Sequence, residues 1–366
     1  MPKQEVSTIF PVFSHAVIPL RISFYAATFQ ASVSALNWSG MIFGSIKVQL
    51  TRLGLGLCAF AILSPALLAS TGGPKLPPEA VQAMDKIYAG DPQAAIVILR
   101  RLQQSEPESP LAFLLEAEAT WWRIYCDNAE VRYGMIDAWK RGKKNEDEQY
   151  LEFVDRVIAL AQEQIARTNS AEMHLYAGNG YALKARMYAL RGENRAVAHA
   201  GVAARTEFLH ALEIDPQMAD ATAGLGLYNY YVDSLSSAGK VLRFFMGIPG
   251  GDRNEGIRQM QVVIDRGVIS PVTMRFYLAK NLRNFDRAYE RALVVAKPLG
   301  TRYPQNTMFQ LLLGNLNAEL GRPEKAGEYF RLAVQATDAD RPDCSSCSTC
   351  KNHVREIASS FGVQPH

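Results

Sequence analysis

Small and aromatic residues recur at fixed helical spacing along the second half of the chain. Three such sets are Ala204, Phe208 and Ala211, then Ala292, Ala296 and Leu299, and finally Ala326, Phe330 and Ala333. Residues spaced by three or four positions lie on one face of a helix. The spacing therefore predicts antiparallel helix pairs, in which the small residues allow close approach and the aromatic side chain fills the groove between pairs.

A proline and then a Leu-Gly pair follow the first two sets in the same order. Pro216 and Pro304 follow the first two sets, and a Leu-Gly pair comes at the same distance after each proline, at Leu225-Gly226 and at Leu313-Gly314. This order resembles the tetratricopeptide repeat (TPR), in which Leu-Gly on one helix precedes Ala, an aromatic residue, Ala and Pro on the next. The resemblance implies an all-α fold, a TPR-like α-solenoid of antiparallel helix pairs, with about five or six pairs that each contact only their neighbours.

The first half of the chain continues the helical pattern. Helices are predicted at 79–88 and 91–105, and Pro110 opens a third that contains the adjacent Trp121 and Trp122. Because neighbouring side chains on a helix point in different directions, we expect one tryptophan to pack in the core and the other to line a groove or cap the stack. No segment alternates with period two between hairpin turns, so the chain is expected to be nearly all helix.

The N-terminal region has the composition of a targeting segment. Residues 41–70 place Lys47 and Arg52 before an apolar run and small residues, as in a signal peptide or, alternatively, an uncleaved membrane anchor. Residues 1–40 are interpreted either as a non-native extension from a start codon placed too early or as an unusual leader. Cys58 lies inside the apolar run and is interpreted as a hydrophobic residue rather than a lipidation site. The remaining divisions are a linker at 71–78, a TPR-like repeat domain at 79–340 and a Cys-containing segment at 341–366.

The net positive charge of the chain comes from this N-terminal region. Four basic residues against one acidic residue before position 70 account for the whole net charge of +3. A near-neutral repeat domain argues against nucleic acid as a partner, because nucleic-acid binding requires a dense basic surface. The most charged stretch, 141–148, mixes both signs and is expected to be a solvated turn and helix start.

One repeat is interrupted by an unusual insert after Leu227. A Tyr-rich helix is followed by an apolar stretch and by the turn Ile248-Pro249-Gly250-Gly251-Asp252-Arg253. The glycines permit backbone angles closed to other residues, and Asp252 with Glu255 has the spacing of a capping box. In the structural interpretation, Gly250 and Gly251 form the turn, Asp252 and Glu255 cap the next helix, Arg253 pairs with a carboxylate and the aromatic residues pack.

A binding interpretation of the same insert stays open beside the structural one. Tyr, Phe and Arg side chains dominate binding hot spots. The candidate partner-binding residues, expected on the concave face of the solenoid, are Tyr228, Tyr231, Arg243, Phe244 and Arg253. A third alternative is that Val241 to Ile248 dips into a membrane, although this stretch has few basic residues.

Residues 220–260 resemble two groups of TPR proteins. The first is a bacterial set, mostly uncharacterised, with a similar Tyr-rich helix and Ile-Pro-Gly-Gly-Asp-Arg turn. The second is the eukaryotic inclusion-body-clearance family, from which this sequence departs in having Tyr for Phe and a Pro-Gly-Gly turn. The resemblance implies a fold and a segment identity, with no activity attached.

A cluster of potential soft ligands lies near the C-terminus. Cys344, Cys347, Cys350 and His353 recur at three-residue spacing, which on a helix places them along one side. The cluster is compatible with a local disulfide and a spare thiol in an oxidising compartment, with a metal site, or with inert or reactive thiols. Cys126 is interpreted as a buried small hydrophobic residue.

The sequence contains no familiar catalytic signature. It has no His-Glu-x-x-His helix, no phosphate-binding loop and no Gly-x-Ser-x-Gly elbow. His174, His199 and His210 are expected in different parts of the array, without carboxylate or cysteine companions. We therefore expect no catalysis and no cofactor. The preferred prediction is an exported, periplasmic or envelope-associated bacterial TPR scaffold that binds a protein or peptide and meets a membrane only through its N-terminal segment. The alternative is a metal-binding or thiol-redox protein that acts through the C-terminal cysteines.

Overall fold

The computed structural model describes residues 73–128, 130–132, 135–137, 141–338 and 347–362. The predicted leader, the signal segment with Cys58, and Cys344 lie outside these residues. The helices are α1 (Pro78–Tyr88), α2 (Pro92–Ser105), α3 (Pro110–Asp127), α4 (Glu146–Thr168), α5 (Ala171–Arg191), α6 (Asn194–Ile214), α7 (Ala221–Asp233), α8 (Ser237–Phe245), α9 (Arg253–Arg266), α10 (Pro271–Asn284), α11 (Tyr289–Arg302), α12 (Thr307–Glu319), α13 (Pro323–Asp338) and α14 (Cys347–Ser360). Every helix in this part of the chain is too short or too polar to cross a bilayer.

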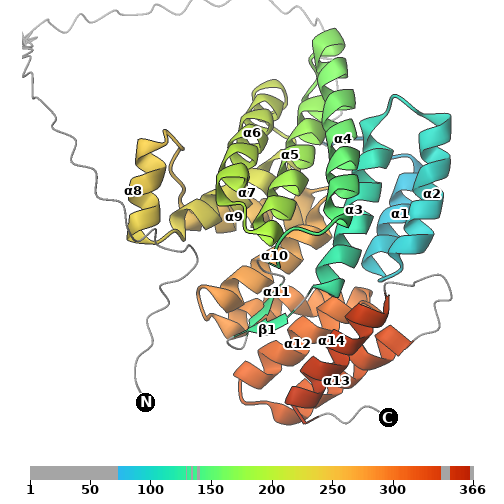
Figure 1. The fold of residues 1–366 in the computed structure, drawn as a ribbon, viewed down its shortest axis with the longest axis vertical. Coiled ribbons are helices and arrows are strands. Elements are labelled where there is room, and N and C mark those ends of the chain that lie inside the picture. The colour runs from blue at the N-terminus through green and yellow to red at the C-terminus, as the bar shows by residue number, and fades with distance from the viewer. Residues whose placement is uncertain (1–72, 129, 133–134, 138–140, 339–346, 363–366) are drawn as a thin grey trace, which may run out of the picture. The chain divides into compact units, whose positions relative to one another are not determined.

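The helices pack as consecutive pairs (Figure 1). The pairs are α1 with α2, α3 with α4, α5 with α6, α7 with α9, α10 with α11, and α12 with α13, and α14 packs on α13. Because each helix covers the apolar face of its partner and of the next pair, no pair buries its hydrophobic stripe alone. The all-α, TPR-like solenoid predicted from the sequence is therefore the observed fold.

In the two repeats whose set contains a phenylalanine, its ring fills the groove that the sequence pattern predicted. Phe208 of α6 is fully buried, and a Cβ atom added at Gly224 of α7 would lie 1.8 Å from its ring. Phe330 of α13 is also fully buried, and a Cβ atom at Gly314 of α12 would lie 2.7 Å from its ring. Glycine at these positions is required because the opposing ring occupies the space of a side chain.

The first helices of distant pairs also meet, which the sequence analysis did not anticipate. Trp121 Nε1 of α3 donates a hydrogen bond to Tyr277 Oη of α10 (3.3 Å), and the ring of Trp122 packs edge-on against Phe309 of α12 at 5.7 Å between centroids. Tyr88 of α1 forms a 3.0 Å hydrogen bond with Thr273 of α10. The expectation that each unit contacts only its neighbours was therefore wrong. The cause is this group of large aromatic side chains on α1, α3, α10 and α12, which exclude water together.

Both adjacent tryptophans are buried, which corrects the expectation that only one would be. Trp121 is 5% exposed and Trp122 is 7% exposed. Trp121 also contacts Tyr150 of α4, while Trp122 also contacts Phe276 of α10. Two neighbouring side chains can both be internal here because α3 has other helices on more than one side.

A short two-stranded antiparallel sheet follows α3. Strand β1 (Glu130–Arg132) pairs with β2 (Met135–Asp137) in the register Glu130 to Asp137, Val131 to Ile136 and Arg132 to Met135. Strands of three residues are too short to show an alternating pattern, which explains why the sequence did not predict them.

The charged stretch before α4 is only partly solvated. Asp147 is fully buried, and it accepts hydrogen bonds from the Arg141 guanidinium and from Lys144 N. Burial raises the pKa of Asp147, but these hydrogen bonds outweigh it and hold the pKa below its ordinary value. The predicted solvated turn is correct for the exposed Lys143 and Glu148 and wrong for the Arg141–Asp147 pair.

Candidate functional site

The insert consists of α8 and its flanking turns, residues 234–252. The sequence placed its start directly after Leu227, which was wrong, because the Tyr-rich residues 228–231 continue the repeat helix α7. The helices on either side of it, α7 and α9, pack directly on each other. Two glycines allow them to approach closely, since a Cβ atom at Gly256 of α9 would lie 2.6 Å from the carbonyl oxygen of Gly226 of α7. The insert is therefore extruded from an intact helix pair, and α8 (yellow) stands apart from α7 and α9 in Figure 1.

Two of the candidate binding residues hold the turn after α8. Tyr228 Oη donates a 2.8 Å hydrogen bond to the Pro249 carbonyl, and Arg243 Nη1 donates a 3.2 Å hydrogen bond to the Ile248 carbonyl. Arg205 lies 5.6 Å from the centre of the Tyr228 ring. Burial raises the pKa of Tyr228, so its hydroxyl stays protonated and can donate. Tyr228 and Arg243 thus position the segment around α8.

Two further candidates connect α7 and α9 to the following pair. Tyr231 Oη donates a 3.0 Å hydrogen bond to Asn281 Oδ1 of α10. Arg253 donates to Asp286 (2.5 Å) and to Ser234 Oγ (3.1 Å), and its guanidinium lies 5.3 Å from the centre of the Tyr230 ring. These side chains therefore fix the base of the insert.

The residues of the predicted turn and cap lie where the insert rejoins the repeat. Asp252 accepts a 3.0 Å hydrogen bond from Glu255 N at the start of α9. A Cβ atom at Gly251 would lie 2.5 Å from the Asn229 carbonyl oxygen, and one at Gly250 would lie 3.1 Å from Arg243 Nη1. Gly251 therefore packs too closely against α7 for a larger residue, whereas at Gly250 the end of the Arg243 side chain would have to shift slightly. The expectation of backbone angles closed to other residues is confirmed for Gly247, with φ 66°, and was wrong for Gly250 and Gly251.

Phe244 differs from the other candidates because it faces solvent. Its side chain is 75% exposed, and the nearby Val241 and Met246 are 57% and 43% exposed. These three residues are called the α8 patch below. Comparable exposure occurs elsewhere at Val294 of α11, which is 72% exposed. The α8 patch is distinguished by gathering three exposed apolar side chains within six residues of one extruded segment.

The C-terminal cysteines lie at and before the start of α14. Cys347, Cys350 and His353 belong to this helix, which packs against α13 and α3. Their ligand or redox role remains a prediction. Cys126 at the end of α3 is half-buried and disulfide-bonded, so its interpretation as a simple buried hydrophobic residue was wrong. A cysteine beside the core can serve both as packing and as a cross-link.

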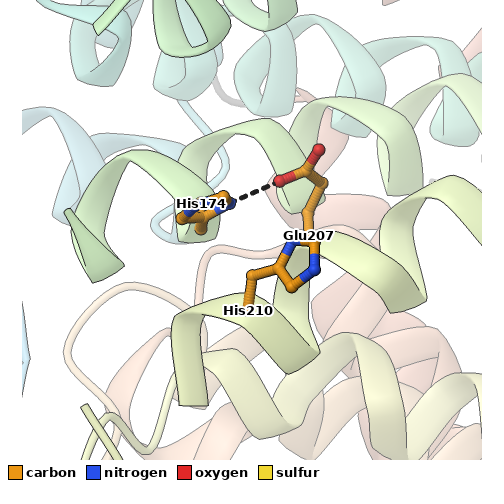
Figure 2. Close-up of side chains that lie close together, drawn as sticks. All are labelled: His174, Glu207 and His210. Carbon is orange, nitrogen blue, oxygen red and sulfur yellow. Dashed lines mark hydrogen bonds and ion pairs between the residues drawn. The ribbon is translucent and has the colours of Figure 1, made fainter. Parts of the chain in front are cut away.

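Two of the three histidines that were expected in different parts of the array lie together. His174 of α5 and Glu207 and His210 of α6 place their potential ligand atoms within 4.8 Å of one another (Figure 2). The expectation that these histidines lie apart without a carboxylate companion was therefore wrong for His174 and His210. One signal was visible in the sequence, because Glu207 precedes His210 by three residues and shares its helix face.

A polar network that the sequence did not reveal lies between α3, α5 and α10. Glu118 accepts hydrogen bonds from Arg186 (2.8 Å), Trp122 Nε1 (3.2 Å) and Thr273 Oγ1 (3.0 Å). Burial lowers the pKa of Arg186, but Tyr277 and Glu118 outweigh it, so the pKa lies above its ordinary value and the ion pair persists. Glu118, Arg186 and Thr273 also line a small cavity. Because these groups already hydrogen-bond one another, we interpret the network as structural.

No protein-family model and no curated protein matches the sequence. Among solved structures, the chain is similar to the crystal structure of yeast Tom70, with 10% sequence identity and a TM-score of 0.27. The match covers 78% of this chain and 88% of that one. The fold assignment rests instead on the helix pairs themselves, which make this chain a TPR-like, predominantly helical repeat protein.

Proposed function

We infer that this protein is a binding scaffold that recognises a protein or peptide through the α8 patch, without catalysing a reaction. The supporting observation is the exposure of Phe244, at 75%, on a segment extruded from an otherwise intact helix pair. Exposed aromatic and aliphatic side chains on a positioned segment supply the apolar contact area of binding hot spots. Tyr228 and Arg243 contribute by holding the segment, and Tyr231 and Arg253 by fixing its base.

This proposal moves the binding surface away from the inner side of the repeat stack. The aromatic side chains of Trp121, Trp122 and Phe309 on the first helices of the pairs are buried against one another. A buried aromatic group offers a partner little area, whereas the α8 patch is accessible.

A protein partner fits the α8 patch better than a membrane. Interfacial helices combine an apolar face with several basic side chains that contact anionic lipid. The segment 237–246 contains only Lys240 and Arg243 as basic residues, and Arg243 donates to the Ile248 carbonyl. Charge attraction to lipid is therefore weak here.

Export is part of the same proposal. The disulfide at Cys126 supports it, because structural disulfides persist in oxidising compartments. The resemblance of residues 220–260 to bacterial TPR proteins and to the inclusion-body-clearance family stays a prediction about the fold of this segment and adds no activity to the proposal. The alternative role for Cys347, Cys350 and His353 predicts bound metal or a reversible thiol. Because the Cys126 disulfide by itself changes the number of free thiols on reduction, elemental analysis for bound metal is the measurement that separates a metal site from pure scaffolding.

Site-specific photo-crosslinking in native cells tests the proposal. A benzophenone amino acid replaces Phe244 in one variant and Val294, the matched exposed residue on α11, in another. We expect a discrete protein adduct from position 244 and none from position 294. Adding Val241→Asp to the first variant should abolish the adduct, while circular dichroism shows an unchanged fold.

Two results would contradict the proposal. One is equal adduct formation at positions 244 and 294, which would indicate random collision. The other is an adduct with lipid alone, which would favour the membrane alternative for Val241 to Ile248.

A further inference from the structure

The cluster of His174, Glu207 and His210 has the composition and placement of a transition-metal site. Glu207 and His210 lie one turn apart on α6, and His174 comes from the antiparallel neighbour α5 (Figure 2). Two imidazoles and one carboxylate are a ligand set typical of zinc sites that keep a fourth position open. Oxygen-preferring ions such as Mg²⁺ and Ca²⁺ are disfavoured, because two of the three donors are imidazole nitrogens.

The hydrogen bonds of His174 prepare one ring nitrogen to bind a cation. Nε2 lies 2.9 Å from Asn169 Oδ1, and Nδ1 lies 2.6 Å from Glu207 Oε2. Both ring nitrogens thus face oxygen acceptors, whereas a neutral imidazole has only one N–H to donate. In the tautomer with Nε2–H donating to Asn169 Oδ1, the Nδ1 lone pair and the Glu207 carboxylate converge on one point, which a proton or a metal ion can occupy.

Neighbouring polar groups orient the ligands as in established metal sites. Gln162 Nε2 of α4 donates a 2.7 Å hydrogen bond to Glu207 Oε1, which leaves Oε2 directed at His174. Asn169 fixes the His174 ring from the other side. Metal-binding histidines and carboxylates usually have such outer hydrogen bonds, which set ring tautomer and ligand direction.

The three residues differ in burial, and their side chains lie close enough to share one ion. His174 is 6% exposed, Glu207 is half-buried and His210 is exposed, so the site opens to solvent on one side. The rings of His174 and His210 are 5.2 Å apart between centroids. Ligand atoms around tetrahedral zinc lie about 3.4 Å apart. Metal binding therefore requires the 2.6 Å contact between His174 Nδ1 and Glu207 Oε2 to open slightly and the exposed His210 side chain to move closer.

We propose that His174 Nδ1, Glu207 and His210 bind one divalent transition-metal ion, with zinc as the best-matched ion. Binding displaces to solvent the proton between His174 Nδ1 and Glu207. Because the ion joins α5 to α6, it stabilises the central pair of the repeat stack.

Zinc binding by the full chain, measured by equilibrium dialysis and elemental analysis, tests the proposal. His210→Ala removes an exposed ligand, and Glu207→Gln removes a carboxylate at nearly constant size. His199→Ala removes an exposed histidine of the same helix outside the cluster and is the matched control. We expect wild type and His199→Ala to bind equally, and the other two variants to lose one zinc equivalent or at least tenfold in affinity.

Cobalt substitution separates this site from the C-terminal cysteines. The cobalt signal lost in His210→Ala should be that of nitrogen and oxygen ligands, without a thiolate charge-transfer band. Circular dichroism confirms that each variant is folded. The proposal is overturned if wild type binds no zinc, if His210→Ala and Glu207→Gln retain the wild-type stoichiometry and affinity, or if the signal they lose contains the thiolate band.

Discussion

The aromatic group on α1, α3, α10 and α12 and the α8 patch use similar side chains in opposite ways. Trp122 is 7% exposed, whereas Phe244 is 75% exposed. The first joins helices that are more than 150 residues apart in sequence, and the second belongs to a segment extruded between two helices that pack without it. The contrast indicates that stability resides in the aromatic group and that recognition, as proposed, resides in the α8 patch.

Truncating an aromatic side chain should have very different effects in the two regions. Trp122→Ala leaves a cavity among packed rings and should lower the free energy of unfolding by about 3–5 kcal/mol. Phe244→Ala, at an exposed position, should change it by no more than about 0.5 kcal/mol. Chemical denaturation followed by circular dichroism measures both. Equal losses would contradict the assignment of stability to the aromatic group.

A buried ion pair should contribute more to the free energy of unfolding than the exposed ion pair at α8. Asp147→Ala leaves the buried Arg141 guanidinium without its partner and should cost about 2–3 kcal/mol. The pair of Lys240 with Asp233 beside α8 is half-exposed, so Lys240→Gln should cost no more than about 1 kcal/mol.

The buried pair also predicts a pH dependence of stability. Because the pKa of Asp147 is lowered in the folded state, its contribution is fully present above the ordinary aspartate pKa of about 4 and is lost as pH falls toward the folded value. Asp147→Asn should flatten this acid limb of the stability curve. If Asp147→Asn leaves the acid part of the stability curve unchanged, the ionised Asp147 carboxylate does not stabilise the folded state.

Glycine substitutions probe packing at closely matched positions. Gly224→Ala places a methyl group against the Phe208 ring and should cost about 1–3 kcal/mol. Gly239→Ala in α8 meets neighbouring atoms only at 3.4 Å or beyond, so it should leave stability unchanged or increase it by about 0.5–1 kcal/mol. Thermal unfolding of the two variants gives the comparison. A tolerated Gly224→Ala would contradict the close approach of α6 and α7.

Features that depend on spacing within one helix could be predicted from the sequence, whereas contacts between distant helices could not. Phe208 and Phe330 were predicted as groove-filling residues because their spacing within one helix is a local signal, and because a Leu-Gly pair follows Phe208 and precedes Phe330. The contact of Trp121 with Tyr277 was not predictable, because helical periodicity identifies an apolar face but not the distant helix that covers it. The neighbours-only expectation failed for this reason.

The candidate sites show the same limit. The insert at α8 was visible as an interruption of the repeat, and Tyr228 and Arg253 were visible as unusual residues near its two ends. Which of them face solvent depends on the hydrogen bonds to Pro249 and Asp286, which are tertiary contacts. The proximity of His174 and His210 depends on how α5 and α6 are aligned against each other. The sequence alone showed only that Glu207 and His210 share a helix face.

A double-mutant cycle between Trp122 and Phe309 tests most directly whether sequence-distant first helices stabilise each other. Trp122→Leu, Phe309→Leu and the double variant keep the positions apolar while removing the ring contact at 5.7 Å between centroids. The structure predicts a coupling free energy of about 0.5–1.5 kcal/mol from denaturant unfolding. Additivity within about 0.3 kcal/mol would show that α3 and α12 do not stabilise each other through these rings.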